Sequence, residues 1–173
     1  VNADGSLTLS NPTAPGTYTF EYRLNNVVSF DDGLVTVQVQ ASPVANDDTL
    51  IMLAGSTFNA DLLIDNGAGP DSPGVPVYNN LTFGGGNLGG LVTDNPAGSS
   101  VAFAGGTLTV NLNGTVSLVN PTLAGLYTFQ YRLSSALPAF DDATVAFEVR
   151  RAPTAVDDGT YTMGTGQTLS ITT

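Results

Sequence analysis

The stretch "VNLNGTVSLVNPTLAGLYTFQYRL", residues 110–133, decides the fold because its apolar residues recur at every second position. This period places them on one face of an extended strand. The residues that share this face near its end are Tyr127, Phe129, Tyr131 and Leu133. Asn113-Gly114 separates two further alternating segments and is a strong signal for a tight hairpin. The stretch therefore predicts antiparallel β-structure.

The same stretch occurs twice in the chain. "VNADGSLTLSNPTAPGTYTFEYRL" begins at Val1 and aligns with the stretch from Val110 at an offset of 109 residues. We therefore predict a tandem repeat of about 109 residues. Its parts are the C-terminal half of one repeat (1–42), a complete repeat (43–152) and the first strands of the next (153–173). We expect this to be a section of a longer array, and strand exchange between chains is the alternative.

The pattern of each repeat is typical of a β-sandwich, with about seven short strands and frequent turn signals and no helical period. "PGTYTF" and "AGLYTF" resemble the start of strand F in immunoglobulin domains, where a Tyr closes a tyrosine corner two residues before the usual Cys. Phe20 and Phe129 stand in place of that Cys. We therefore predict an all-β, immunoglobulin-like antiparallel β-sandwich. The expected strands are A at 49–54, B at 57–64, F at 126–133 and G at 143–150.

Composition excludes several classes of function. The 173 residues include 15 acids and 4 basic residues, a net charge of −11, and no His, Cys or Trp. Nucleic acids and anionic membrane surfaces attract basic proteins, so neither is an expected partner. Zinc sites are usually built from His and Cys, which this chain lacks, so zinc is not an expected ligand. Carboxylate pairs remain for an enzyme such as a glycosidase, but they recur in each repeat without a Trp or His, and we expect no catalysis.

Asp-Asp pairs recur at a fixed spacing. "FDDGLVTVQVQASPVANDD", residues 30–48, and "FDDATVAFEVRRAPTAVDD", residues 140–158, each hold two pairs 16 residues apart. The strand between them separates the two pairs by more than about 20 Å, so pairs that meet must come from different strands. At the N-terminal pole of the complete repeat we expect Asp47, Asp48, Asp65, Asp71, Asp141 and Asp142 to converge. The corresponding residues of the flanking repeats are Asp31, Asp32, Asp157 and Asp158.

Six converging carboxylates repel one another unless something neutralises them. Calcium suits such a site because it takes 6 to 8 oxygen ligands in flexible geometry. Two alternative roles for these acids stay open. Asp is common in turns because its side chain bonds nearby backbone, and an acidic surface is also an adaptation to salt. The repeated pairing favours calcium as the bound ion.

The ordered signals resemble a known family. "PVANDDTLIMLAGSTF", "LLIDNGAGPDSPG", "GTLTVNLNGTVSLVNPTLAGLYTFQYRL" and "ATVAFEV" are similar to the bacterial immunoglobulin-like and cadherin-like tandem repeats of giant secreted adhesins and extracellular fibres. The 62–74 loop departs from the family in keeping only Asp65 and Asp71 as acids. The resemblance implies a non-catalytic structural module on a bacterial cell surface, stiffened by calcium at each junction.

Two non-enzymatic functions, from different classes, remain as hypotheses. In the first, the module is a spacer whose partners are neighbouring repeats of the same chain, or identical chains in a fibre. In the second, it recognises a glycan or a cell-surface protein through a loop face. Near-identical repeats favour the spacer.

Overall fold

The computed structural model describes residues 1–137 and 139–171. Strands dominate these residues, and the helical element among them is the short 3-10 turn η1, Gly86–Leu88. The strands are β1 Gly16–Asn25, β2 Phe30–Val39, β3 Asp48–Leu53, β4 Thr57–Asp61, β5 Asn80–Gly84, β6 Asn95–Pro96, β7 Ser100–Phe103, β8 Gly106–Val110, β9 Thr115–Val119, β10 Gly125–Ser134 and β11 Phe140–Arg150. In the described ranges no helix has the length and apolar character needed to cross a membrane.

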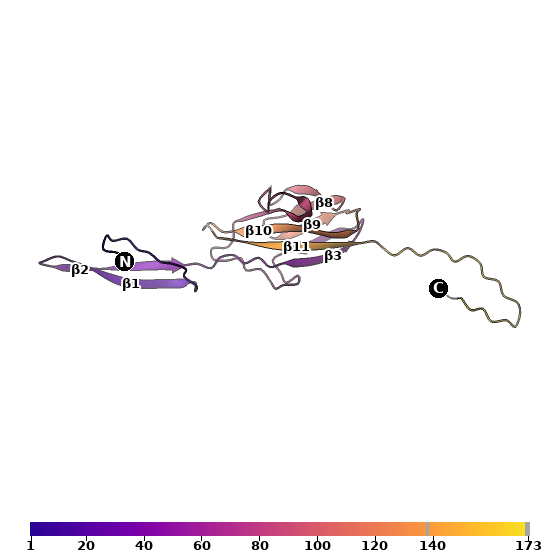
Figure 1. The fold of residues 1–173 in the computed structure, drawn as a ribbon, viewed down its shortest axis with the longest axis horizontal. Coiled ribbons are helices and arrows are strands. Elements are labelled where there is room, and N and C mark those ends of the chain that lie inside the picture. The colour runs from indigo at the N-terminus through magenta and orange to yellow at the C-terminus, as the bar shows by residue number, and fades with distance from the viewer. Residues whose placement is uncertain (138, 172–173) are drawn as a thin grey trace.

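Strands β3 to β11 form two packed sheets (Figure 1). One sheet has the order β3-β11-β10-β5-β6 and the other β4-β9-β8-β7. β3 runs parallel to β11, whereas the other neighbouring strands are antiparallel. Because the chain passes from β3 to the opposite sheet at β4 and returns at β5, the arrangement is that of an immunoglobulin-like sandwich. The predicted fold class is confirmed, and β3, β4, β10 and β11 are the expected strands A, B, F and G.

The core of the sandwich is built from the alternating residues of both sheets. Phe129 has no exposed surface and stands where immunoglobulin domains carry a disulfide cysteine. Its ring stacks on Phe147 at a centroid distance of 6.2 Å and meets Phe83 and Phe103 edge-on. Such aromatic pairs add about 0.5–1.5 kcal/mol each beyond the burial of their area. Aromatic packing therefore occupies the place of the missing disulfide.

A glycine-rich loop closes one sheet edge. β5 stops pairing with β10 at Gly84, and beyond that point Asn87 Oδ1 accepts a hydrogen bond from Thr128 N at 2.7 Å. Gly86 has φ +53° and lies so close to the Thr128 carbonyl that a Cβ would overlap it. Glycine is needed here because the loop backbone lies against the strand.

The first hairpin has the same register as the last one. β1 pairs with β2 from Gly16↔Val39 to Asn25↔Phe30, as β10 pairs with β11 from Gly125↔Val149 to Ser134↔Phe140. The β1–β2 hairpin extends from one end of the sandwich, and residues 151–171 extend from the other and form no strand with the described residues (Figure 1). The two segments flank one complete sandwich.

Replacing Phe129 by Ala tests the aromatic core. The substitution removes a fully buried ring and is expected to lower the free energy of unfolding by about 3–5 kcal/mol. Urea unfolding followed by circular dichroism measures the loss. Leu126, which is 67% exposed on the same strand, is the control, and its Ala variant should change stability by less than about 0.5 kcal/mol. Equal effects of the two substitutions would contradict this account of the core.

Candidate functional site

The linker, residues 40–47, leads from the hairpin into the sandwich and lies along the B–C loop, residues 62–79. Backbone hydrogen bonds join the two segments much as they join two strands. These bonds run from Val75 N to Ala41 O (2.8 Å), from Val44 N to Ser72 O (2.9 Å) and from Ser72 N to Val44 O (2.9 Å). The linker is therefore packed against the domain that follows it.

Gly74 lets the loop approach the linker closely. It has φ +77°, and a Cβ at this position would lie 2.7 Å from Pro43 N. A left-handed φ favours glycine on conformational grounds, and the close backbone makes the steric requirement stricter. Gly69, in the same loop, also has a positive φ of +108° but has open space around its Cβ position.

Three of the predicted carboxylates bind backbone amides in and around the linker. The pairs are Ala45 N to Asp141 Oδ2 (3.0 Å), Asn46 N to Asp71 Oδ1 (2.7 Å) and Thr144 N to Asp47 Oδ1 (2.7 Å). A hydrogen bond to a charged group contributes about 1.5–3 kcal/mol to the stability of the folded state. The acids thus fix the linker and the start of β3 against the sandwich.

Asp48 is the buried member of this group. The residue is 3% exposed, and its Oδ2 has no hydrogen-bond partner among the residues that the structure describes. Its pKa is raised to about 7, mainly by burial and also by the neighbouring charges of Asp71 and Asp47, although hydrogen bonds from Asn66 and Tyr131 partly favour the ionised form. Asp48 is therefore mainly protonated below about pH 7, and above that pH it carries a buried negative charge.

Tyr131 links Asp71 to the linker. Its hydroxyl is fully buried and donates to Asp71 Oδ2 at 2.6 Å, and it lies 3.1 Å from the carbonyl oxygen of Asn46. Burial raises the pKa of the Tyr131 hydroxyl well above its ordinary value, and the hydrogen bond to Asp71 acts in the same direction. Burial also raises the pKa of Asp71 itself. The tyrosine therefore stays a neutral donor at any physiological pH.

Asp142 faces away from this group. Arg132 Nε and Nη2 donate to its two oxygens at 2.6 and 2.7 Å, and the guanidinium lies 3.8 Å from the centroid of the Phe140 ring. The first hairpin repeats this arrangement with Arg23, Asp32 and Phe30. Adjacent residues of a strand point to opposite sides, and for this reason the carboxylates of Asp141 and Asp142 face different partners.

The other predicted residues also lie outside the group. Asp65 Oδ1 accepts hydrogen bonds from Gly67 N and Gly69 N within its own loop, which is the turn role that Asp often has. Asp31 is exposed at the start of β2. Asp157 and Asp158 are exposed beyond β11. Four of the six acids of the complete repeat, Asp47, Asp48, Asp71 and Asp141, therefore gather about the linker.

The chemistry of the group suits a hard cation, because all its ligands are oxygens and Asp48 Oδ2 is buried without a partner. Within residues 1–137 and 139–171, no three acidic side chains are placed to bind a metal ion as they stand. Backbone amides also bind one oxygen each of Asp47, Asp71 and Asp141. Calcium binding by the six acids stays a prediction.

Sequence reasoning missed the polar residues that complete the site. The alternation of apolar residues places Tyr131 on the inner face of its strand. No pattern in the sequence indicates that its hydroxyl contacts Asp71. Asn46 contributes its amide to Asp71, and its side-chain Nδ2 donates to Pro70 O at 2.9 Å. The Pro- and Gly-rich "GPDSPG" marks a turn without indicating that the turn pairs with the linker.

Comparison with known proteins finds only distant similarity to solved structures. Neither a protein-family model nor a curated protein matches the chain. One similar solved structure contains the N-terminal eight Ig domains of Down Syndrome Cell Adhesion Molecule isoform 1.30.30, at 12% identity and a TM-score of 0.37, covering 80% of this chain and 18% of that one. Another is a nucleoside hydrolase-related hypothetical protein from Saccharophagus degradans that is associated with carbohydrate metabolism. The identity is 14% and the TM-score 0.36, and the match covers 65% of this chain and 26% of that one.

The raised pKa of Asp48 predicts that stability falls with pH in the absence of divalent cations. A folded-state pKa of about 7, above the ordinary 3.8, gives stability that is present below the unfolded pKa and is lost as pH rises through 7. Between pH 5 and 8 the expected loss is about 2–3 kcal/mol. Urea unfolding in EDTA measures it. An Asp48→Asn variant should show a much flatter profile, and an unchanged slope would exclude Asp48 as its source.

Gly74→Ala is expected to release the linker from the B–C loop, because its Cβ meets the Pro43 backbone. Limited proteolysis with elastase should then cut within residues 40–47 several times faster than in the parent. Gly69→Ala is the matched control, since it imposes backbone strain in the same loop without the contact. Similar cleavage rates in both variants would show that strain in the loop, rather than the linker contact, is responsible.

Proposed function

We propose that this chain is a non-catalytic structural module of a long extracellular adhesin or surface filament, stiffened by calcium at the junctions between its domains. The observation that carries the proposal is the position of Asp48. It lies buried beside Asp47 and Asp71 where the linker enters the sandwich, with one oxygen unpartnered. A junction that gathers negative charge around a short linker is suited to hold a cation between domains.

The proposed ion would be held by Asp48 together with Asp47 and Asp71. The charges of Asp47 and Asp71 both act on the Asp48 carboxyl group. When bound, calcium supplies the positive charge that offsets their mutual repulsion. The backbone amides of Ala45 and Asn46 already fix two linker residues to Asp141 and Asp71. Binding would therefore strengthen a junction whose geometry the polypeptide itself defines.

A catalytic role has less support. Three of the gathered carboxylates accept hydrogen bonds from backbone amides. Carboxylates bound in this way stabilise the fold and are not placed to transfer a proton to a substrate. The sequence also holds no His or Cys to act as a base or nucleophile. The partners that fit this role are neighbouring immunoglobulin-like repeats, outside the cell and on its surface.

Thermal melting in EDTA and in increasing calcium tests the proposal. A ligand that binds only the folded state stabilises it by RT ln(1 + [L]/Kd), about 2.7 kcal/mol at 100 times Kd. We expect the melting temperature of the parent to rise with calcium at neutral pH. Asp48→Asn should show a much smaller rise.

Asp94→Asn is the charge-matched control for this test. Asp94 accepts a hydrogen bond from Leu91 N in the loop after η1, and an Asn oxygen keeps that acceptor while one negative charge is removed. The control should respond to calcium like the parent. Absence of any calcium response in the parent, or an equal response in Asp48→Asn, would refute the proposed ion site.

A further inference from the structure

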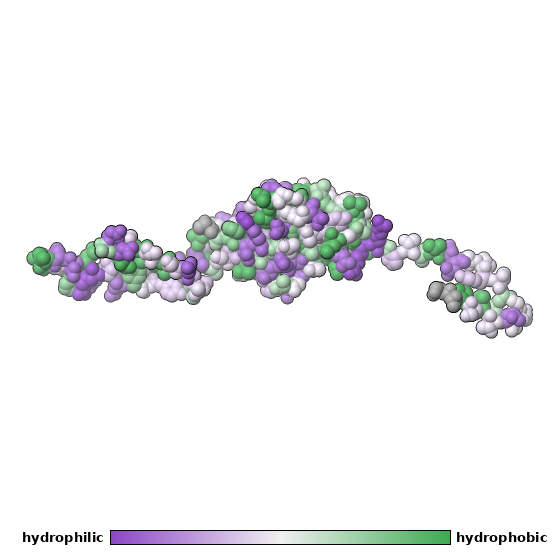
Figure 2. All heavy atoms as spheres, viewed as in Figure 1, coloured by the Kyte–Doolittle hydropathy of each residue, from purple (hydrophilic) through white to green (hydrophobic). Residues whose placement is uncertain are grey.

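The first and last strands of the sandwich, β3 and β11, lie side by side and run in the same direction. They pair from Asp48↔Val145 to Leu53↔Arg150, and beyond the last pair Ala54 N donates to Arg150 O at 2.8 Å. The chain enters β3 at one end of the sandwich and leaves β11 at the other (Figure 1). Figure 2 shows narrower parts of the chain on both sides of the sandwich. Tension along the chain therefore passes from β3 to β11.

The parallel direction of the two strands decides how tension acts on their hydrogen bonds. A pull along the chain draws β3 toward the linker and β11 toward the opposite end, so the strands are drawn past each other. The evenly spaced bonds of a parallel pair then share the load and have to break together. Bonds that are loaded from one end of a pair break one after another and resist much less force.

Two carboxylates extend this connection beyond the start of β3. Asp47 Oδ1 accepts a hydrogen bond from Thr144 N at 2.7 Å, and Asp141 Oδ2 accepts one from Ala45 N at 3.0 Å. One acid belongs to the linker and the other to β11, and each binds a backbone amide of the other segment. The same pull loads both bonds. The linker is thus held to β11, although the strand pairing itself begins at Asp48.

A second group of bonds holds the linker to the B–C loop. Val44 and Ser72 form an isolated antiparallel bridge, and Asn46 N donates to Asp71 Oδ1. The loop connects β4 with β5, and neither strand is a neighbour of β11 in its sheet. Tension taken up by the loop reaches β11 only through other strands, whereas the two carboxylates pass it to β11 directly.

We propose that the β3–β11 pair, extended by Asp47 and Asp141, is the load-bearing element of this module and keeps the sandwich folded when the chain is stretched. The inference rests on the proposed adhesin or filament role for its biological meaning, because such a chain is pulled along its length. The element itself needs no cation. Resistance to tension in EDTA and stabilisation by calcium are therefore separate results, and either can fail alone.

The two acids recur with the repeat. Asp31 corresponds to Asp141 and Asp157 corresponds to Asp47, in both cases 110 residues apart. A chain under tension carries the same force at every module, and the weakest module unfolds first. Recurrence of both acids would give each module the same two bonds and so the same resistance.

Force spectroscopy on the full chain in EDTA tests the direction of load. The chain has no Cys, so pairs of introduced cysteines at exposed positions define where the handles attach. Ser42→Cys with Ala152→Cys is the lengthwise attachment, which pulls β3 and β11 past each other. Leu53→Cys with Ala152→Cys pulls on the adjoining ends of the two strands. We expect the sandwich to withstand a clearly higher force in the lengthwise attachment, and equal resistance in both would overturn the inference.

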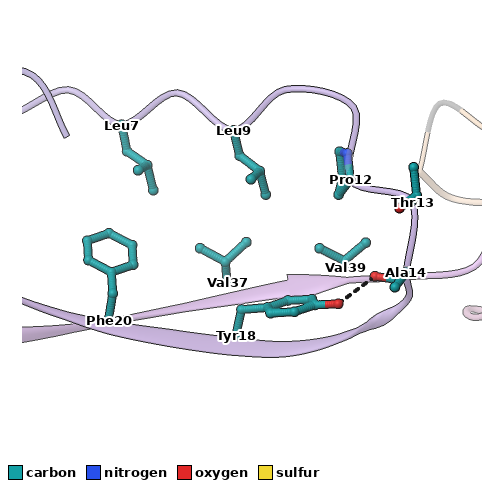
Figure 3. A pocket seen from close by; sticks show the side chains of 9 residues that line it. All are labelled: Leu7, Leu9, Pro12, Thr13, Ala14, Tyr18, Phe20, Val37 and Val39. Carbon is teal, nitrogen blue, oxygen red and sulfur yellow. Dashed lines mark hydrogen bonds between the residues drawn. The ribbon is translucent and has the colours of Figure 1, made fainter.

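The first handle is placed in the linker so that the β1–β2 hairpin carries no load. In that hairpin Leu7 and Leu9 face Phe20 and Val37 across a pocket (Figure 3). A two-stranded ribbon is marginally stable and would unfold before the sandwich. With the handle at Ser42, the unfolding event that is measured belongs to the sandwich.

Substitution of the two carboxylates tests their part in the load-bearing element. Asp47→Ala with Asp141→Ala removes both acceptors that join the linker to β11. Under constant lengthwise force this double variant should unfold about tenfold faster than the parent, or more. Asp94→Ala is the matched control, because it also removes a carboxylate that accepts a backbone amide, here from Leu91 N in a loop outside β3 and β11. The control should unfold under force nearly as the parent does.

Val116→Ala separates resistance to tension from equilibrium stability. Val116 is buried in β9, in the sheet that does not contain β3 and β11, and the substitution leaves a cavity that lowers the free energy of unfolding in urea. It should change the rate of forced unfolding less than the double Asp variant does, even where its loss in urea is as large. Forced unfolding of the double variant no faster than that of Asp94→Ala would overturn the inference. So would forced unfolding rates that simply follow the stabilities in urea.

Discussion

The backbone amides of a short linker need acceptors, and carboxylates of the sandwich provide them. Asp141 and Asp71 bind the amides of Ala45 and Asn46, and Tyr131 holds Asp71 from the core side. These contacts run from the aromatic core to the linker. The position of the linker therefore depends on the packing of the core. Asp48 is buried at the same place with Oδ2 unpartnered among the described residues, and this oxygen is the reason to propose a cation.

The β1–β2 hairpin repeats local features of the complete sandwich. The hairpin reproduces the strand register and the Arg–Asp–aromatic cluster of the complete repeat, yet its apolar face is left half covered. A two-stranded ribbon is marginally stable in water.

Period two predicted the strands because burial of one face dictates it. Phe129 and the hairpin at Asn113-Gly114 lie where the pattern placed them. The division of the Asp141-Asp142 pair was harder to foresee: Asp142 contacts Arg132, whereas Asp141 contacts the linker. The same alternation implies this division, but the choice of partner depends on contacts across the fold. Pairing of the B–C loop with the linker involves backbone groups, which every sequence has, and so left no signal.

The most direct test of the central claim is amide hydrogen exchange at Ala45 and Asn46 in the full chain. If the carboxylates fix the linker to the sandwich, these two amides should exchange as slowly as amides within the sheet containing β3, and Asp71→Ala should speed Asn46 while leaving the centre of β10 protected. Exchange at both amides as fast as at Thr160, in the exposed C-terminal segment, would contradict the account and mean that the junction is a flexible tether.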